Sequence, residues 1–101
     1  MSRNYSARTV TVSAPLLNAG ARALGANPNR VVLVVSVPTA HWVGVGNRNY
    51  VSNDDLFAAF EGVDFRVMAY RDFGPLITAE IFIIGLGTSV QITEVARVPI
   101  G

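Results

Sequence analysis

Residues 31–37, with the sequence VVLVVSV, form the stretch that decides the fold. Five of these side chains are Val, and β-branched residues favour a pleated strand over a helix. The apolar character does not alternate, so both faces of this strand are expected to be covered. Residues 77–86 (ITAEIFIIGL) predict a second long strand that is apolar on both faces.

Shorter segments around these two also have strand character. Apolar and polar side chains alternate in residues 8–13 and 63–70, and residues 41–45 (HWVGV) and 90–98 follow turn signals. Residues 87–89 (Gly-Thr-Ser) predict a tight turn, so residues 90–98 are expected to pair with 77–86 as a hairpin. Five to seven short strands with so little helix predict a mostly β protein, an antiparallel β-sandwich or small barrel.

Two segments are less regular. Residues 14–26 are compatible with irregular chain, with a short strand near residues 22–24, or with a weak helix. Residues 53–62 predict the one short helix, because Asn53 can cap it and Asp54 and Asp55 suit its first turn. The apolar residues that follow share one helical face, and a Gly ends the segment.

The length of 101 residues fits one domain. Residues 1–8 are polar and are expected to be a flexible N-terminal arm, and residues 9–101 a single β domain. No segment resembles a signal peptide, and the longest apolar run is too short to span a bilayer. The expected site of synthesis is therefore a cytoplasm.

The chemistry of most enzyme classes has no matching residues. The chain has no Cys and a single His, His41, which cannot build a His-rich metal site and has no evident nucleophile to activate. Gly44-Val45-Gly46 lacks the third Gly and the helix of a dinucleotide site. The stretch from Asn53 to Asp55 is a poor calcium loop. We therefore expect a protein without catalytic residues, cofactor or metal, although a site assembled between subunits is a further alternative.

Charge and composition indicate what kind of partner to expect. The net charge is +1, which gives no electrostatic reason to bind nucleic acid or an anionic membrane. Half of the residues are apolar and 15% are charged, against about 25% in an average domain. Together with two strands that are apolar on both faces, this balance predicts a homo-oligomer, a dimer or trimer. All eight basic residues are Arg, which suits packed interfaces but also fits a GC-rich genome.

Three stretches of the chain carry a resemblance to a known family. They are residues 24–37 (LGANPNRVVLVVSV), 42–46 (WVGVG) and 70–97 (YRDFGPLITAEIFIIGLGTSVQITEVAR). Their turns and strands resemble those of small β-sandwich proteins of tailed bacteriophage particles, which are head decoration (cement) proteins or modules of spikes and tail fibres. The helix expected at residues 53–62 departs from that pattern, where a turn-rich loop is usual. The resemblance implies a structural role and no catalytic residue.

The resemblance implies a virion protein on the capsid surface, made in the host bacterial cytoplasm. Its expected function is to decorate and cement the phage head through contacts with the major capsid protein and with copies of itself. The alternative is a receptor- or glycan-binding module of a spike or tail, with Trp42 and Tyr50 as an aromatic platform. The candidate partner contacts are Arg3, Tyr5, Arg8, Arg48, Tyr50, Tyr70 and Arg71.

Overall fold

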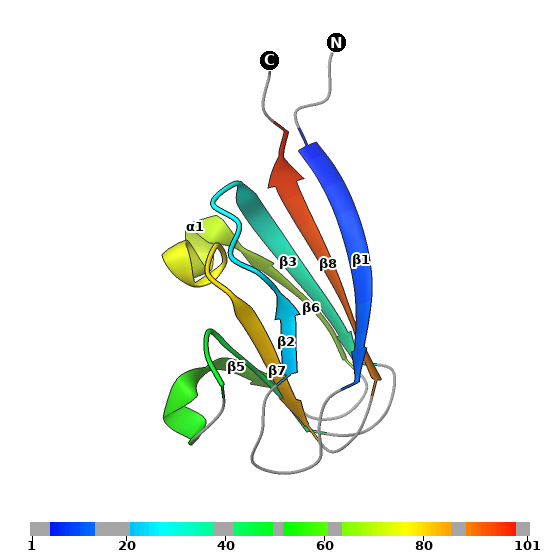
Figure 1. Cartoon of the computed structure of the whole chain (residues 1–101), viewed down its shortest axis with the longest axis vertical. Coiled ribbons are helices and arrows are strands. Elements are labelled where there is room, and N and C mark those ends of the chain that lie inside the picture. The colour runs from blue at the N-terminus through cyan, green and yellow to red at the C-terminus, as the bar shows by residue number, and fades with distance from the viewer. Residues whose placement is uncertain are drawn as a thin grey trace.

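The protein is described by a computed structural model, which covers residues 5–13, 21–37, 42–49, 52–60, 64–85 and 89–98. Within these ranges the chain forms two four-stranded antiparallel sheets that pack against each other (Figure 1). The predicted antiparallel β-sandwich is therefore confirmed. The described residues form eight strands, more than the five to seven that the sequence indicates.

Each sheet combines strands from distant parts of the chain. The first sheet has the order β1–β8–β3–β6 and the second has the order β2–β7–β4–β5. The strands of the first sheet are β1 (Tyr5–Ser13), β8 (Ser89–Arg97), β3 (Arg30–Val37) and β6 (Asp64–Ala69). Those of the second are β2 (Ala21–Leu24), β7 (Ile81–Gly85), β4 (Val43–Gly46) and β5 (Leu56–Phe60).

The core lies between the two sheets and is made of aliphatic side chains. Alternate residues of β3 and β8 point inward from the first sheet, and residues of β4 and β7 face them from the second. The buried core side chains are Leu24, Leu33, Val35, Val37, Val43, Val45, Met68, Ile77, Ile81, Ile83, Val90 and Ile92. Each one that leaves water contributes roughly 1.5–3 kcal/mol before the cost of ordering the chain.

The helix predicted for residues 53–62 is wrong. Ser52 and Asp55 form a capping box, but it starts only a single 3-10 turn, η1 (Asn53–Asp55). From Leu56 the chain continues as β5, which pairs with β4. A helix this short has little stability of its own, so hydrogen bonding to a neighbouring strand decides its structure.

The hairpin predicted between residues 77–86 and 90–98 is also wrong. β7 begins only at Ile81 and pairs with β2 and β4, whereas β8 pairs with β1 and β3 in the other sheet. Residues 77–80 belong to the turn that follows η2 (Gly74–Leu76). Both strands are interior strands with a neighbour on each side. The continuous apolar sequence of β7 suits an interior position, whereas β8 alternates between side chains buried in the core and more polar side chains that face outward.

Two boundaries differ from the sequence-based prediction, and one of the alternatives for the segment 14–26 agrees with the structure. β1 begins at Tyr5, so half of the predicted arm belongs to a strand, and residues 1–4 lie outside the described ranges. The segment 14–26 contains β2, which agrees with the short strand among its alternatives. The strand predicted at residues 63–70 ends at Ala69, where the one-turn helix α1 (Tyr70–Phe73) begins.

Candidate functional site

The outer face of the first sheet is a candidate binding surface, because apolar and hydroxyl side chains cover nearly all of it. Strand alternation and register place sixteen residues there, and only one of them, Arg97, is charged. We call this surface the open face. Its residues are Tyr5, Ala7, Thr9, Thr11, Ser13, Val32, Val34, Ser36, Phe65, Val67, Ala69, Ser89, Gln91, Thr93, Val95 and Arg97.

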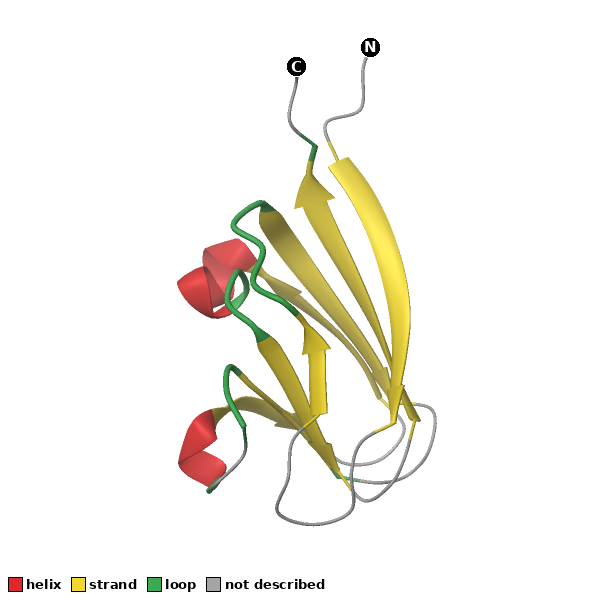
Figure 2. Cartoon of the chain, viewed as in Figure 1, coloured by secondary structure: helices red, strands yellow, loops and turns green. Residues whose placement is uncertain are grey.

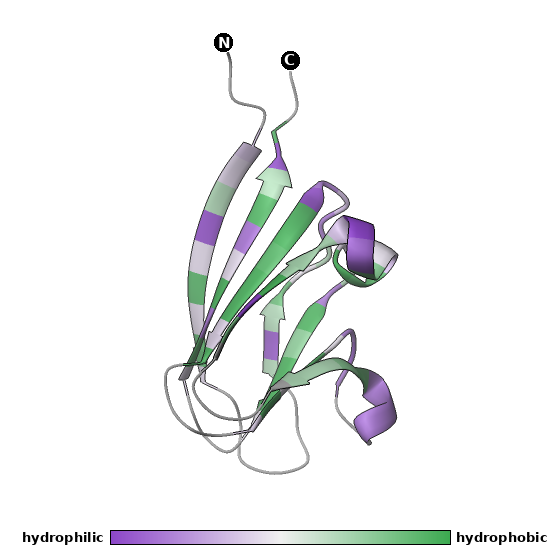
Figure 3. Ribbon diagram, turned by 180° about the vertical axis from the view of Figure 1, so that it is seen from behind, coloured by the Kyte–Doolittle hydropathy of each residue, from purple (hydrophilic) through white to green (hydrophobic). Residues whose placement is uncertain are grey.

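Large apolar side chains of the open face are in contact with solvent. Phe65 is 65% exposed, Val67 56% and Tyr5 51%. On β3, next to β6, Val34 lies opposite Val67 and Val32 opposite Ala69, and both valines are only partly buried. Figure 3 shows β3 coloured hydrophobic along most of its length, whereas β1 and β8 alternate in hydropathy. Exposed apolar patches with few charges are typical of interaction surfaces, which makes the open face a candidate site.

Among the described residues no helix covers the open face. Figure 2 shows neither helical segment over it: η1 precedes β5 of the second sheet, and α1 follows β6 at the end of the first sheet. In α1, the ring of Phe73 packs edge-on against Phe57 of β5, with 5.8 Å between the ring centroids. Phe73 and Phe57 both pack against the core, so α1 supports the interior of the sandwich.

A buried ionic cluster joins the two sheets at one end of the sandwich. Arg30 is 1% exposed, and its Nε donates a hydrogen bond of 2.8 Å to Oε2 of Glu94. Its Nη atoms donate to the carbonyls of Ile77 (2.9 Å), Ala79 (3.0 Å) and Gly25 (2.7 Å), which lie in the loops beside β7 and β2. Oε1 of Glu94 lies 3.3 Å from a guanidinium nitrogen of Arg8.

A β-bulge explains why Arg30 points inward. Val32, Val34 and Ser36 face outward, so simple alternation would place Arg30 outward as well. The register of β3 against β8 shifts between Arg30 and Val32, which turns the Arg30 side chain into the interior. The guanidinium and carboxylate are mutually neutralised there, which makes the cluster a structural link between the sheets.

The residues predicted as partner contacts are not gathered in one place. Tyr5 lies on the open face, whereas Arg8 lies on the inner side of β1 in the ion pair with Glu94. Arg48 pairs with Asp55 at the η1 turn. Tyr70 and Arg71 begin α1, and Arg71 is highly exposed. Arg3 and Tyr50 lie outside the described residues.

The other candidate sites of the sequence have structural roles or fall outside the described ranges. Glu80 pairs with Arg22, and Glu94 pairs with Arg30 and Arg8. Trp42 is half-buried over Gly44, and Tyr50 and His41 lie outside the described residues. In the described part of the chain, no three acidic or His residues gather as a metal site, and no helix has the length and hydropathy needed to cross a membrane.

The sequence-based prediction missed two features, the exposed apolar face of β6 and the buried ion pair of Glu94. Each has a recognisable pattern in the sequence. The alternation in residues 63–70 places Phe65 and Val67 on one face, but it does not show that this face points to solvent. Glu94 occupies a buried position between Ile92 and Ala96, and a carboxylate at such a position requires a buried cation. That signal predicts a partner for Glu94 without identifying Arg30.

Comparisons with protein-family models, with curated proteins and with solved structures gave no match.

Proposed function

We propose that this chain is a structural assembly protein that works through protein–protein contact, and that it decorates and cements the head of a tailed bacteriophage. Its partners in this proposal are copies of itself and the major capsid protein. The open face is the observation that carries the proposal. Arg97 is its one charged residue, Phe65, Val67 and Tyr5 are exposed on it, and none of the described helices covers it.

A second copy of this chain is the occupant that suits the open face best. The strands have nine (β1, β8), eight (β3) and six (β6) residues, which at about 3.3 Å per residue and about 4.8 Å between strands give a face of roughly 500 Å². Two such faces bury roughly 1,000 Å² in total, which is about the minimum expected of a specific interface. The one charged residue, Arg97, lies at the end of β8, so the rest of the face can pack on its own two-fold copy without desolvating a like-charge pair.

Sedimentation velocity at micromolar concentrations tests this interface. We expect the protein to sediment as a dimer and Val67→Glu to sediment as a monomer, because the dimer would bury the new carboxylate without a partner. Leu76→Glu is the matched control, since Leu76 is 40% exposed in η2 and lies off the open face. A monomeric wild type, or a Val67→Glu protein that still dimerises, would contradict the assignment of this face.

Binding to phage particles tests the proposed role as a decoration protein of the phage head. Purified protein is added to heads that lack decoration, and the bound copies are counted by quantitative mass spectrometry. Decoration predicts many copies, in a fixed ratio to the major capsid protein, whereas a handful of copies per particle would contradict it.

We propose that the N-terminal arm anchors the chain on the particle, and a deletion that tests this must leave β1 intact. Removal of residues 1–8 would delete the part of β1 that pairs with β8. Deletion of residues 1–4 leaves the described strand intact and is expected to weaken particle binding without changing the melting temperature. Unchanged binding would contradict an anchoring role for the arm.

A further inference from the structure

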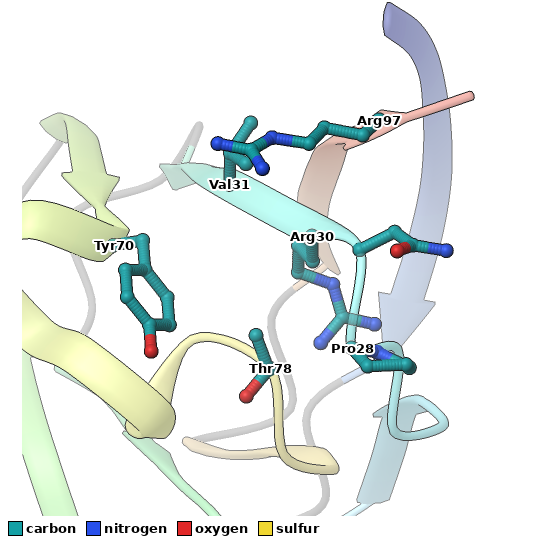
Figure 4. Close-up of a pocket in the computed structure, with 7 residues that line it drawn as sticks. Pro28, Arg30, Val31, Tyr70, Thr78 and Arg97 are labelled. Atoms are coloured by element: carbon teal, nitrogen blue, oxygen red, sulfur yellow. The ribbon is translucent and has the colours of Figure 1, made fainter. Parts of the chain in front are cut away.

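A polar pocket lies at the end of the sandwich where β8, β3 and α1 come together. Its volume is ≈ 440 Å³, which lies within the range of small-molecule sites. Pro28, Asn29 and Val31 form one part of its wall, and Tyr70, Thr78 and Arg97 bring polar groups from three other segments. Figure 4 shows Arg97 reaching across Val31 toward the side on which Tyr70 and Thr78 lie.

The charge of this pocket is positive and not compensated within it. Arg97 forms no ion pair or side-chain hydrogen bond with the described residues, and no carboxylate is part of the wall. Arg30 also borders the pocket, but its guanidinium is engaged by Glu94 and three carbonyls. The planar guanidinium of Arg97 is therefore the cation that can receive a carboxylate in two parallel hydrogen bonds.

The hydroxyl groups of the pocket have different hydrogen-bonding capacities. The Thr78 hydroxyl donates to the carbonyl of Pro75 at 3.0 Å, so toward the pocket it can only accept. The Tyr70 hydroxyl, which points to the side of Thr78, can donate or accept. A ligand that satisfies both ends of the pocket needs an anionic group for Arg97 and a hydroxyl donor for Thr78.

We infer that this pocket binds a small hydroxy acid of about the size of a uronic acid. Its carboxylate lies on Arg97, and a hydroxyl donates to Oγ1 of Thr78 while Tyr70 bonds a neighbouring ligand oxygen. Pro28 and Val31 provide the apolar wall against which the body of the ligand packs. The site shares Arg97 with the end of the open face but includes none of its exposed apolar residues Tyr5, Phe65 and Val67. The inference does not rest on the proposed structural role.

Titration of ¹⁵N-labelled protein, followed by amide chemical shifts, tests the pocket with three probes. D-glucuronate carries both groups, acetate carries only the carboxylate, and D-glucose carries only hydroxyls. We expect saturable shifts at Asn29, Val31 and Thr78 with glucuronate, weaker binding of acetate, and no saturation with glucose. No saturable shift with glucuronate, or equal binding of glucose, would overturn the inference.

Three variants locate the binding on the proposed residues. Arg97→Gln is expected to weaken glucuronate binding about tenfold or more, because hydrogen bonds to a charged group are the strongest. Tyr70→Phe keeps the ring and is expected to weaken it a few-fold. Arg71→Gln, on the same helix but outside the pocket, is expected to bind like the wild type. Unchanged affinity in Arg97→Gln and Tyr70→Phe would also overturn the inference.

Discussion

The outer faces of the two sheets differ in what covers them. Outside the second sheet, β4 carries Gly44 and Gly46 at its outward positions, and the side chains of Leu56 and Trp42 lie directly over Gly44. All four residues of β4 are buried as a result. Outside the first sheet, Val and Thr side chains stand on β3 and β8, and the described residues leave them partly exposed.

In the proposed assembly, residues outside the second sheet would contribute to stability and residues outside the first sheet would contribute to binding. Glycine on the outside of β4 lets neighbouring segments of the same chain approach the backbone closely. The outer face of β4 is therefore covered by side chains of the same chain. The first sheet keeps larger side chains on its outer face, and these remain available to a second molecule. Substitutions on the closed side should therefore affect folding, and those on the open side should affect association.

The largest effect is expected where the two sheets are linked. Glu94→Gln removes the charge that neutralises Arg30 and leaves a buried guanidinium without a counter-ion. We expect a loss of about 3–5 kcal/mol in the free energy of unfolding, measured by urea denaturation. A loss below about 1 kcal/mol, the range of exposed ion pairs, would show that the cluster is not effectively buried.

A second prediction concerns the closed side. A Cβ added at Gly46 would lie 2.4 Å from the carbonyl oxygen of Asp55, so the backbone must move to accept Gly46→Ala. We expect a destabilisation of about 1–3 kcal/mol in thermal or urea unfolding. Gly25→Ala is the control, because a Cβ at Gly25 meets nothing within 4 Å. Equal effects at the two positions would contradict the close packing outside β4.

A third prediction compares adjacent residues of β3 that face opposite sides. Val35→Thr places a hydroxyl in the core, where Val35 is 0% exposed, and is expected to cost about 1–3 kcal/mol of stability. Val34→Thr on the open face is expected to change stability by less than about 0.5 kcal/mol. The same Val34→Thr protein should dimerise more weakly in sedimentation experiments. Loss of stability without any change in dimerisation would contradict the functional assignment of the open face.

The smallest effect is expected at the edge of the second sheet. Glu80 and Arg22 form an ion pair of 3.1 Å, and their side chains are 44% and 62% exposed. Glu80→Gln should cost about 0–1 kcal/mol, and less at high salt. A salt titration of the melting temperature, with Glu94→Gln in parallel, checks whether the exposed pair and the buried cluster differ as expected.

The sequence was sufficient for those features that depend on local chemistry. Asn27-Pro28-Asn29 forms a turn, as Pro and Asn favour, with the amide of Arg30 bonded to the carbonyl of Asn27 at 3.1 Å. The β-branched run of β3 and the alternation of β1 are strands because such side chains pack well on a pleated sheet. The excess of apolar residues also indicated a surface beyond what one core can bury.

The predictions that were wrong concern features that depend on contacts between distant segments of the chain. The residues of β5 suit either a helix or a strand, and pairing with β4 decides between them. The Gly-Thr-Ser sequence favours a turn but does not specify which strands pair, and β7 and β8 each have a neighbour on both sides in different sheets. The inward turn of Arg30 comes from a bulge against β8, which no local pattern in β3 reveals.

Side-chain shape and hydropathy act locally, so the order of residues was enough to predict a β protein with more apolar residues than one core requires. The tertiary structure alone decided where that surface lies. It placed Phe65 and Val67 on the solvent side of β6, closed the outside of β4 with Leu56 and Trp42, and brought Arg97 beside Tyr70. Each of these placements follows from strand order and register, which are set by the packing of the whole domain.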